Sequence, residues 1–505
     1  MTNGRNSNRL RLVRAHIDTS QQPVVFMHRD CGVCRAEGFS AMARVLVRAG
    51  RRQVVATLNV VFDERFGHDV AALSEAAWNA LDPEPEAMGS FSHAEPPGSS
   101  GALRAKVFGQ RLDEAQFQHL MRDAVDNRLS DVELAAFVTA CAGDRLDIAE
   151  TIALTRAMVA VGERIEWDSG PVYDKHCVGG LPGNRTTPIV VALVAAAGYR
   201  MPKTSSRAIT SPAGSADTME TMTTVALDLA AMRRVVEREG GCLVWGGTVC
   251  LSPADDVLIR VEKPLDFDSD GQLVASVLSK KVAAGSTHVL IDMPIGPTAK
   301  VRSAAAADLL EARLLATARA VGLEARVLRT DGTQPVGQGI GPALEARDVL
   351  RVLRGDPLAP LDLRERALDL AGHLLALASG IALTQARARA RELLDDGSAL
   401  RKFMAICQAQ GGFREPLLAD CRHPVLAHRE GRVLAIDNRR LARVAKLAGA
   451  PGSPEAGVDL RRRLGQAVHA GELLFEIHAR TEGELQYALD YTLAHPSIVA
   501  VGDSP

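Results

Sequence analysis

The sequence has few aromatic residues and no long apolar run. Only 4% of its 505 residues are aromatic while 47% are hydrophobic, so the core must be built mainly from alanine, valine and leucine. No run approaches the roughly 18 apolar residues of a membrane-spanning helix. The N-terminus is polar and basic and lacks the apolar segment of a signal peptide. We therefore expect a cytoplasmic protein without a membrane partner.

Net charge and clustered cysteines are lacking as well. The chain has 59 basic and 61 acidic residues, so bulk charge gives no support for a nucleic-acid partner. Its eight cysteines are scattered, which fits a reducing compartment better than a disulfide framework. Cys31 and Cys34 lack a second pair for a zinc site and a thioredoxin-like context, although His28 is close. We interpret them as buried thiols at a turn, predict no metal, and leave their role open.

Composition and periodicity divide the chain into domains, of which a chain this long should have two to four. Apolar runs at 24–27 and 54–61 predict strands, and 71–81 predicts a helix. Ser130 and Glu133 have the spacing of a capping box at a helix start. We expect a multidomain α/β and α+β protein with an N-terminal α/β-type domain (1–85), a Pro-, Gly- and Ser-rich linker (86–102), a helical lobe (103–172, completed by about 262–285), a central α/β domain (173–345), and a helical connection with a C-terminal α+β domain (346–505).

The most informative stretch, 171–220, holds two loops joined by an apolar segment. The first loop, 174–187, has three glycines within five residues, which let the backbone turn sharply and approach a ligand. It leads into the apolar run 189–197, which predicts a buried helix starting near 186–188. Free N–H groups and the positive end of the helix dipole at such a position favour an anion. A tight turn between strand and helix is the simpler interpretation, and no Gly-Lys-Ser/Thr ends the loop as in a Walker motif.

The second loop, 203–217, gathers hydroxyl side chains around Arg207. Hydroxyls and a guanidinium together suit a phosphate group. Taken alone, the loop could equally be a solvated Ser/Thr-rich connection. Because two such loops lie about 30 residues apart, the pair favours a phosphate site.

These loops resemble the signatures of the thymidine/pyrimidine-nucleoside phosphorylase family. The motifs are DKHCVGGLPGN at 174–184 and SSRAITSPAGSADTME at 205–220, and their spelling is most similar to the long branch that includes the archaeal AMP phosphorylases. The resemblance runs from about 109 to 354 and more weakly to the C-terminus. It implies a pentosyltransferase that uses orthophosphate as co-substrate, needs no cofactor, and forms a homodimer or larger homo-oligomer.

The resemblance also implies roles for single residues. Cys177 stands where short-branch enzymes have serine, and a thiol is a weaker donor. Pro212 removes a backbone N–H that is usual in the family's second loop. The implied residues are, for catalysis, Asp268, His176 and Lys280; for phosphate, Lys175, Cys177, Gly180, Thr187, Ser205 and Ser215; and for the rest of the substrate, Ser206, Arg207, Ala208, Ile209, Thr210, Ser211, Arg260, Ser276 and Lys300.

The implied residues leave the released base open. Arg260, Ser276 and Lys280 match pyrimidine contacts, whereas Asp268 matches a proton donor suited to a purine leaving group. Without the resemblance, Asp268 would be read as a helix N-cap and Lys280 as an exposed helical cation. We expect thymidine and phosphate to give thymine and 2-deoxyribose 1-phosphate. The alternative is AMP or another nucleoside 5′-monophosphate giving free base and ribose 1,5-bisphosphate.

Two other protein classes fit the sequence less well. Anthranilate phosphoribosyltransferases have a similar architecture but use magnesium held by acidic pairs, and no such pair follows 205–211. A nucleotide-sensing protein would bind without releasing base, and the retained Lys175, Arg260 and Lys280 argue against it. The glycine loop at 332–341 is spaced G-x-G-x-G rather than G-x-G-x-x-G, which argues against a dinucleotide site.

Overall fold

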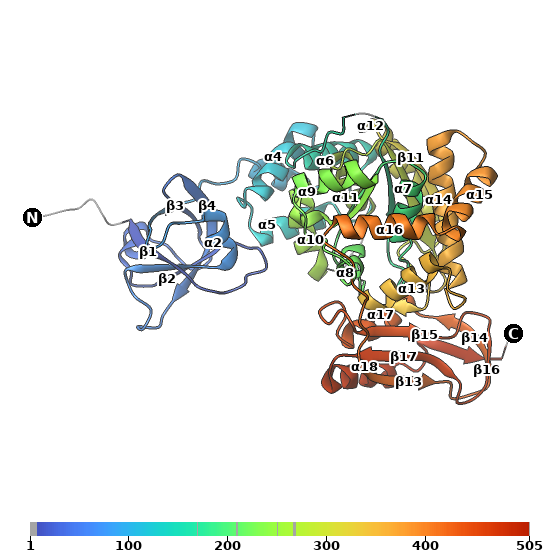
Figure 1. Ribbon diagram of the computed structural model, residues 1–505. Helices are drawn as coiled ribbons and strands as arrows, with labels where there is room; N and C mark the ends of the chain where they lie inside the picture. The colour runs from blue at the N-terminus through green and yellow to red at the C-terminus, as the bar shows by residue number, and fades with distance from the viewer. Residues whose placement is uncertain (1–7, 169, 209–210, 250, 266–268, 504–505) are drawn as a thin grey trace, which may run out of the picture. The chain divides into compact units, whose positions relative to one another are not determined.

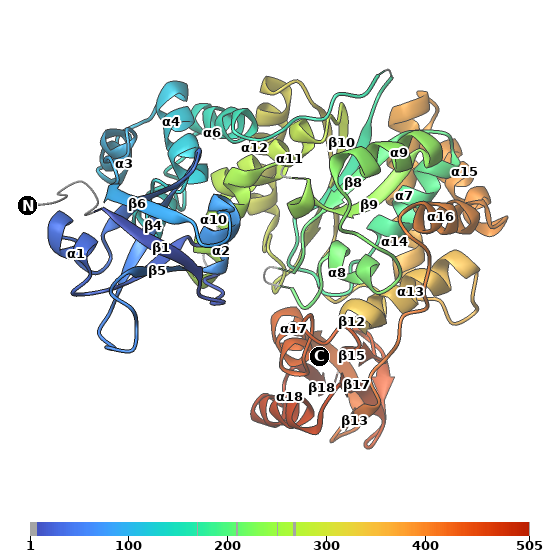
Figure 2. The ribbon, with the colours of Figure 1, turned by 60° about the vertical axis from the view of Figure 1, so that its left-hand side comes forward.

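The computed structural model describes residues 8–168, 170–208, 211–249, 251–265 and 269–503. The chain forms two units (Figures 1 and 2). Unit 1 comprises Met1–Val161 and Pro253–Ser269, and unit 2 comprises Gly162–Ser252 and Asp270–Pro505. Each unit is described by itself.

Unit 1 begins with a closed barrel, drawn in blue in Figure 1. The ring order is β1-β5-β2-β4-β3-β6, and β1 closes it by pairing with β5 on one side and β6 on the other. Leu12, Val25, Leu58 and Phe91 are among the buried residues of its core. The elements are β1 (Arg9–Arg14), β2 (Val24–His28), α1 (Gly32–Glu37), β3 (Arg44–Ala49), β4 (Arg52–Val61), β5 (Val70–Leu73), α2 (Glu75–Leu81) and β6 (Met88–His93).

The barrel differs from the sequence prediction in two places. The range predicted as a linker, 86–102, contains β6, whose Phe91 is only 2% exposed. Glycine and serine have low strand propensity, but pairing with β1 and β3 outweighs it. The range predicted as one helix, 71–81, is divided at Ser74, which ends β5 and caps α2 by accepting a hydrogen bond from the N–H of Ala77.

Helices complete unit 1. The predicted capping box is confirmed, because Ser130 and Glu133 exchange side-chain-to-backbone hydrogen bonds at the start of α5. A buried ion pair, Lys106 with Glu150 at 2.6 Å, joins α3 and α6. The helices are α3 (Ser100–Val107), α4 (Glu114–Val125), α5 (Asp131–Ala140), α6 (Ile148–Ala160) and α10 (Pro253–Leu265).

Unit 2 is built on five parallel strands. β10 pairs with β11 and β7, β8 pairs with β9, and a bridge between Val172 and Arg200 joins the two groups, so the order is β11-β10-β7-β8-β9. Parallel strands covered on both faces are apolar along their length, as β9 and β10 are here. The strands are β7 (Tyr173–Cys177), β8 (Met201–Ser205), β9 (Gly241–Trp245), β10 (His288–Ile295) and β11 (Glu324–Asp331).

The helix predicted after the first loop is confirmed as α7 (Thr187–Ala196), with Pro188 in its first turn. Its residues 189–194 are at most 1% exposed and belong to the largest hydrophobic cluster. No single helix among the described residues is long and apolar enough to cross a membrane; α14 and α15 meet that test together but are bent by 118°. The other helices are α8 (Ser215–Glu220), α9 (Leu229–Glu239), α11 (Asp270–Ala283), α12 (Ala304–Ala320), α13 (Pro342–Arg354), α14 (Leu361–Ser379), α15 (Leu383–Asp395) and α16 (Ser398–Ala409).

The C-terminal part of unit 2 is the predicted α+β domain. One sheet has the order β12-β15-β17-β13 and the other β16-β14-β18. The glycine loop 332–341 contributes β12 (Gly339–Ile340) to the first sheet, so it links the central and C-terminal parts. The remaining elements are β13 (Cys421–Leu426), β14 (Gly431–Ile436), α17 (Asn438–Leu447), β15 (Gly457–Leu460), β16 (Ala467–Val468), β17 (Leu473–Ala479), α18 (Glu482–Ala494) and β18 (Val499–Gly502).

Candidate active site

The two predicted loops leave the same edge of the sheet. The predicted ranges 174–187 and 203–217 include ends of strands and helices. The connecting parts are loop one (178–186), which follows β7, and loop two (206–214), which follows its neighbour β8. In open parallel sheets, ligands bind in the crevice at the carboxyl ends of the strands. Lys203 of β8 donates to the carbonyl of Lys175 at 2.7 Å, so the two strand ends are held together.

Lys175 is fully buried at this edge. Its Nζ donates to Thr186 Oγ1 at 2.9 Å and lies 3.6 Å from a carboxylate oxygen of Asp292. Asn184 and Thr330 donate to the same carboxylate at 3.0 and 2.7 Å. Burial alone would raise the pKa of Asp292, but Lys175 and these donors hold the pKa below its usual value.

Asp174 carries a second buried charge network. It accepts from Lys203 at 2.9 Å, from Lys281 at 2.6 Å, and from the N–H of Lys175 at 2.6 Å. Burial opposes its ionisation, yet Lys203 and Lys281 lower its pKa. Burial also lowers the pKa of Lys281 to about 7. Positive groups therefore outnumber negative ones at the end of β7 whenever Lys281 is protonated.

Burial and the neighbouring lysines change the pKa of His176. Its pKa is lowered well below the usual value, first by burial and then by Lys281, Lys203 and two further lysines. The imidazole is therefore neutral near pH 7 and can exchange hydrogen bonds but not supply charge. The same positive surroundings that keep a proton off His176 would attract an anion.

Cys177 ends β7 as a neutral thiol. Burial and Asp292 raise its pKa to about 11. Its sulfur accepts from Asn184 Nδ2 at 3.3 Å, which leaves the weak S–H donor for another partner.

Glycines let loop one pack closely against two other segments. Gly180 has φ +77°, and a Cβ there would lie 2.6 Å from the backbone nitrogen of Lys300, so these two predicted site residues are neighbours. Gly183 has φ +70°, and a Cβ there would lie 2.2 Å from the carbonyl oxygen of Val336 in the glycine loop. The loop 332–341 is thus a packing surface for loop one.

Acidic residues of α8, the helix that follows loop two, hold the described part of loop two. Asp217 accepts from the N–H groups of Ala208 and Gly214 at 2.6 and 2.8 Å. Arg207 donates to Asp217 and Glu220 and lies 4.7 Å from the ring centroid of Trp245. Its guanidinium is therefore engaged within this region, and its role as a substrate contact stays a prediction. Ser205 has a buried hydroxyl with no hydrogen-bond partner among the described residues.

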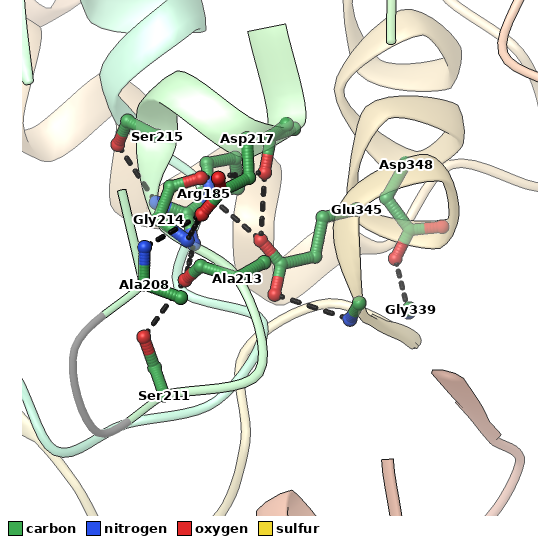
Figure 3. Close-up of polar contacts among 12 residues, drawn as sticks. Arg185, Ala208, Ser211, Ala213, Gly214, Ser215, Asp217, Gly339, Glu345 and Asp348 are labelled. Carbon is green, nitrogen blue, oxygen red and sulfur yellow. Dashed lines mark hydrogen bonds and ion pairs between the residues drawn. The ribbon is translucent and has the colours of Figure 1, made fainter. Parts of the chain in front are cut away.

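Arg185 connects the loops in a way that the sequence did not reveal (Figure 3). Its guanidinium donates to Glu345 Oε2 at 2.6 Å, to Ser215 Oγ at 2.7 Å and to the carbonyl of Ala213 at 2.8 Å. Burial raises the pKa of Glu345, and Arg185 opposes that shift. A lone glutamate in the first turn of a helix gives no signal of such a partner.

The other predicted residues fall in different places. Asp268, Ile209 and Thr210 lie outside the described residues. Arg260 belongs to α10 of unit 1, where it pairs with Asp131 at 2.8 Å. Ser276 and Lys280 both lie on α11 of unit 2. Loop two contains Ser206, which is exposed, and Ser211, which is partly buried. Thr187 is buried and is the first residue of α7.

The thiol pair of the barrel lies directly after β2, at the start of α1. The Cys31 sulfur accepts from the N–H of Cys34 at 3.2 Å, and both residues are buried. A hydrogen bond from the Cys34 side chain is the main cause that lowers the pKa of Cys31 to about 6. The structure thus supplies the strand–turn–helix setting that the sequence did not indicate, with both thiols below the surface.

The same barrel contains a cluster of two histidines and a glutamate. Donor atoms of His28, Glu64 and His68 lie within 4.8 Å of one another. However, the N–H of Asp30 donates to His28 Nδ1 at 3.1 Å, so the neutral ring carries its proton on Nε2 and has no lone pair there for a metal. The His28 and His68 rings also stack at 3.9 Å instead of converging on a point. The donor set does not fit a metal ion.

Comparison with known proteins first defines the class. Residues 100–162 match the helical bundle domain of a glycosyl transferase family, and residues 169–400 match its a/b domain. Two anthranilate phosphoribosyltransferases, from Thermus thermophilus and Saccharomyces cerevisiae, share the fold with a TM-score of 0.50, each matching 61% of this chain. They are 20% and 13% identical to it over 99% and 98% of their own chains.

The family follows from the C-terminal domain and from full-length relatives. Residues 432–497 match the pyrimidine nucleoside phosphorylase C-terminal domain. A protein of Acidovorax sp. named "Putative thymidine phosphorylase 1" is 60% identical over 99% of this chain and 98% of its own length. One of Polaromonas sp., "Putative thymidine phosphorylase", is 60% identical over 98% and 97%. The chain belongs to the thymidine/pyrimidine-nucleoside phosphorylase family, as its motifs predicted.

Proposed function

We propose that the protein catalyses phosphorolysis of thymidine, giving thymine and 2-deoxyribose 1-phosphate. The observation that carries the proposal is the buried cluster of Lys175, Lys203 and Lys281 around Asp174 and Asp292 at the end of β7. This cluster has a net positive charge when Lys281 is protonated. Such a site suits a dianionic nucleophile better than any neutral one. The names of the relatives agree with this substrate.

Orthophosphate would lie between loops one and two. Lys175 supplies the cation, while Ser205 offers a buried hydroxyl that has no partner in the described part of the chain. The start of α7 at Thr187 presents free backbone N–H groups to the same region. These groups hold the nucleophile in place, and positioning with electrostatic stabilisation provides most of the rate in such a displacement.

In the reaction, a phosphate oxygen forms a bond to C1′ of the sugar while the bond from C1′ to the base breaks. The electron pair of that bond leaves with the base. The family resemblance assigns Arg260, Ser276 and Lys280 to the pyrimidine, where cations offset the charge that develops on O2 and N3. Neutral His176 would donate or accept a hydrogen bond at the end of β7.

A nucleoside 5′-monophosphate such as AMP is the second candidate. It is favoured by the close approach of Gly180 to the backbone of Lys300, which places a further lysine beside loop one. A second cation there suits a substrate that carries its own phosphate. The proton donor implied for a purine, Asp268, lies outside the described residues.

The test is a substrate screen on the full-length protein. Thymidine, uridine, cytidine and the 5′-monophosphates are each incubated with and without orthophosphate, and free base is measured by chromatography. We expect thymine release that requires orthophosphate. Release of adenine from AMP with no release from thymidine would replace the main proposal by the second, and no phosphate-dependent release from any substrate would refute both.

A further inference from the structure

Glu345 is buried and lies far in sequence from both loops, yet it contacts the arginine that joins them. Its side chain is 1% exposed, and it is placed by the first turn of α13, which begins after the glycine loop. One carboxylate oxygen accepts from Arg185 Nε at 2.6 Å and from Thr218 Oγ1 at 3.2 Å. The N–H of Gly341 approaches the other oxygen at 3.4 Å.

The guanidinium of Arg185 is thereby fixed in direction. Because its N–H groups form a rigid planar fork, holding Nε against Glu345 also sets where the two terminal nitrogens point. One terminal nitrogen donates to Ser215 Oγ and the other to the carbonyl of Ala213, at 2.7 and 2.8 Å. Loop one, loop two and α13 thus share one set of charge-assisted hydrogen bonds (Figure 3).

The contact with Ser215 has a chemical consequence. A serine hydroxyl has one proton to donate and lone pairs to accept with. Since its oxygen accepts from Arg185, its own proton is available to an acceptor in front of loop two. Polarisation by the adjacent guanidinium also strengthens that donor.

We propose that Glu345, acting through Arg185, is a positioning residue that orients the Ser215 hydroxyl toward orthophosphate. The inference rests on the proposed function, because it takes the anion between the two loops to be the phosphate co-substrate. The role of Arg185 in the site is then to orient the Ser215 hydroxyl, which donates to orthophosphate.

The test measures orthophosphate affinity directly, by calorimetry on the full-length protein, and thermal stability in parallel. We expect Glu345→Gln, which keeps the shape but removes the charge, to weaken phosphate binding on the order of ten-fold, the effect of losing one hydrogen bond to a charged group. In a Ser215→Ala background the same substitution should have no further effect, because the hydroxyl it orients is gone. If Glu345→Gln does not fold, Arg185→Lys serves as the second variant, since an ammonium cannot reproduce the fork.

The matched control is Asp459→Asn. This carboxylate is also 1% exposed and also pairs with an arginine of α13, Arg347 at 2.8 Å, but in the described part of the chain it has no hydrogen bond or ion pair with either loop. It should lower the melting temperature without changing phosphate affinity. An unchanged affinity in Glu345→Gln, or equal losses with and without Ser215, would overturn the proposal.

The outcomes also separate this inference from the proposed function. If the wild-type protein binds orthophosphate but releases no base, the proposed function fails and the binding measurements still decide the role of Glu345. If base is released but Glu345→Gln binds phosphate as the wild type does, the function stands and the inference fails. A wild-type protein that binds no orthophosphate refutes both.

Discussion

At the scale of single residues, protonation decides what each group at the end of β7 can do. Neutral His176 and neutral Cys177 are hydrogen-bonding groups, whereas Lys175 is a buried cation balanced by Asp292. Charge at the site therefore comes from lysines, and the groups beside them supply direction. The weakest of these donors is the Cys177 thiol.

Replacing the Cys177 thiol with a hydroxyl should strengthen phosphate binding. Cys177→Ser should bind orthophosphate about five-fold more tightly, because a hydroxyl is a better donor by roughly one hydrogen bond, ~1 kcal/mol. Calorimetric titration with orthophosphate measures the change. Cys407→Ser, a buried cysteine of α16, is the control and should leave the affinity unaltered. Equal or weaker binding by Cys177→Ser would mean that residue 177 does not contact the anion.

At the scale of elements, segments that determine their own structure were predictable. The capping box of α5, the apolar helix α7 and the two glycine- and hydroxyl-rich loops all carry local signals within a few residues. β6 was missed because its glycine and serines gain stability only from strands far away in sequence. The partner of Arg185 could not be predicted for the same reason, because Glu345 lies 160 residues further on.

The packing of loop one on the glycine loop can be tested with a pair of glycines. Gly183→Ala should weaken orthophosphate binding and lower the melting temperature, because the new methyl group would meet the carbonyl oxygen of Val336. Gly198 has φ +89° but nothing within 4 Å of its Cβ position, so Gly198→Ala has similar backbone strain without a clash. Thermal denaturation and phosphate titration of both variants separate strain from contact. Indistinguishable variants would show that this close approach has no role in the site.

At the scale of the whole molecule, pH should act through histidines that are partly or fully buried. Burial is the main cause of a lowered pKa at His176, His373 and His478. Each binds a proton more weakly when folded than when unfolded, so the stability it contributes is full above about pH 6.5 and is lost as the pH falls. Buried Glu345 and Asp348 act in the opposite sense, because their raised pKa favours the protonated folded state.

We therefore expect a lower melting temperature at pH 5.5 than at pH 7.5. The histidines, Lys281 (pKa about 7) and Cys31 (pKa about 6) all have a lowered pKa in the folded protein and act in the same direction, and carboxyl groups of ordinary pKa titrate below this window. His176→Asn should reduce the difference by removing one of the titrating groups. Differential scanning calorimetry at the two pH values measures both effects. A melting temperature that stays constant or rises on acidification would contradict the assigned directions.

The same scale explains what sequence could not supply. The family follows from motifs, and a helical domain and a central α/β domain follow from the sequence pattern; the comparisons bear out the family, a helical bundle domain and an a/b domain. Closure of six strands into a ring depends on β1 pairing with strands that lie about 60 and 80 residues later, which no local pattern encodes.

That ring has a practical consequence for shortened versions of the protein. β1 is the sole partner on one side of both β5 and β6 among the described strands. A version starting after Arg14 would leave a row of unused N–H and C=O groups on each of them, and such rows recruit strands from neighbouring molecules. Removing β1 would therefore convert a self-contained barrel into a two-sided template for aggregation.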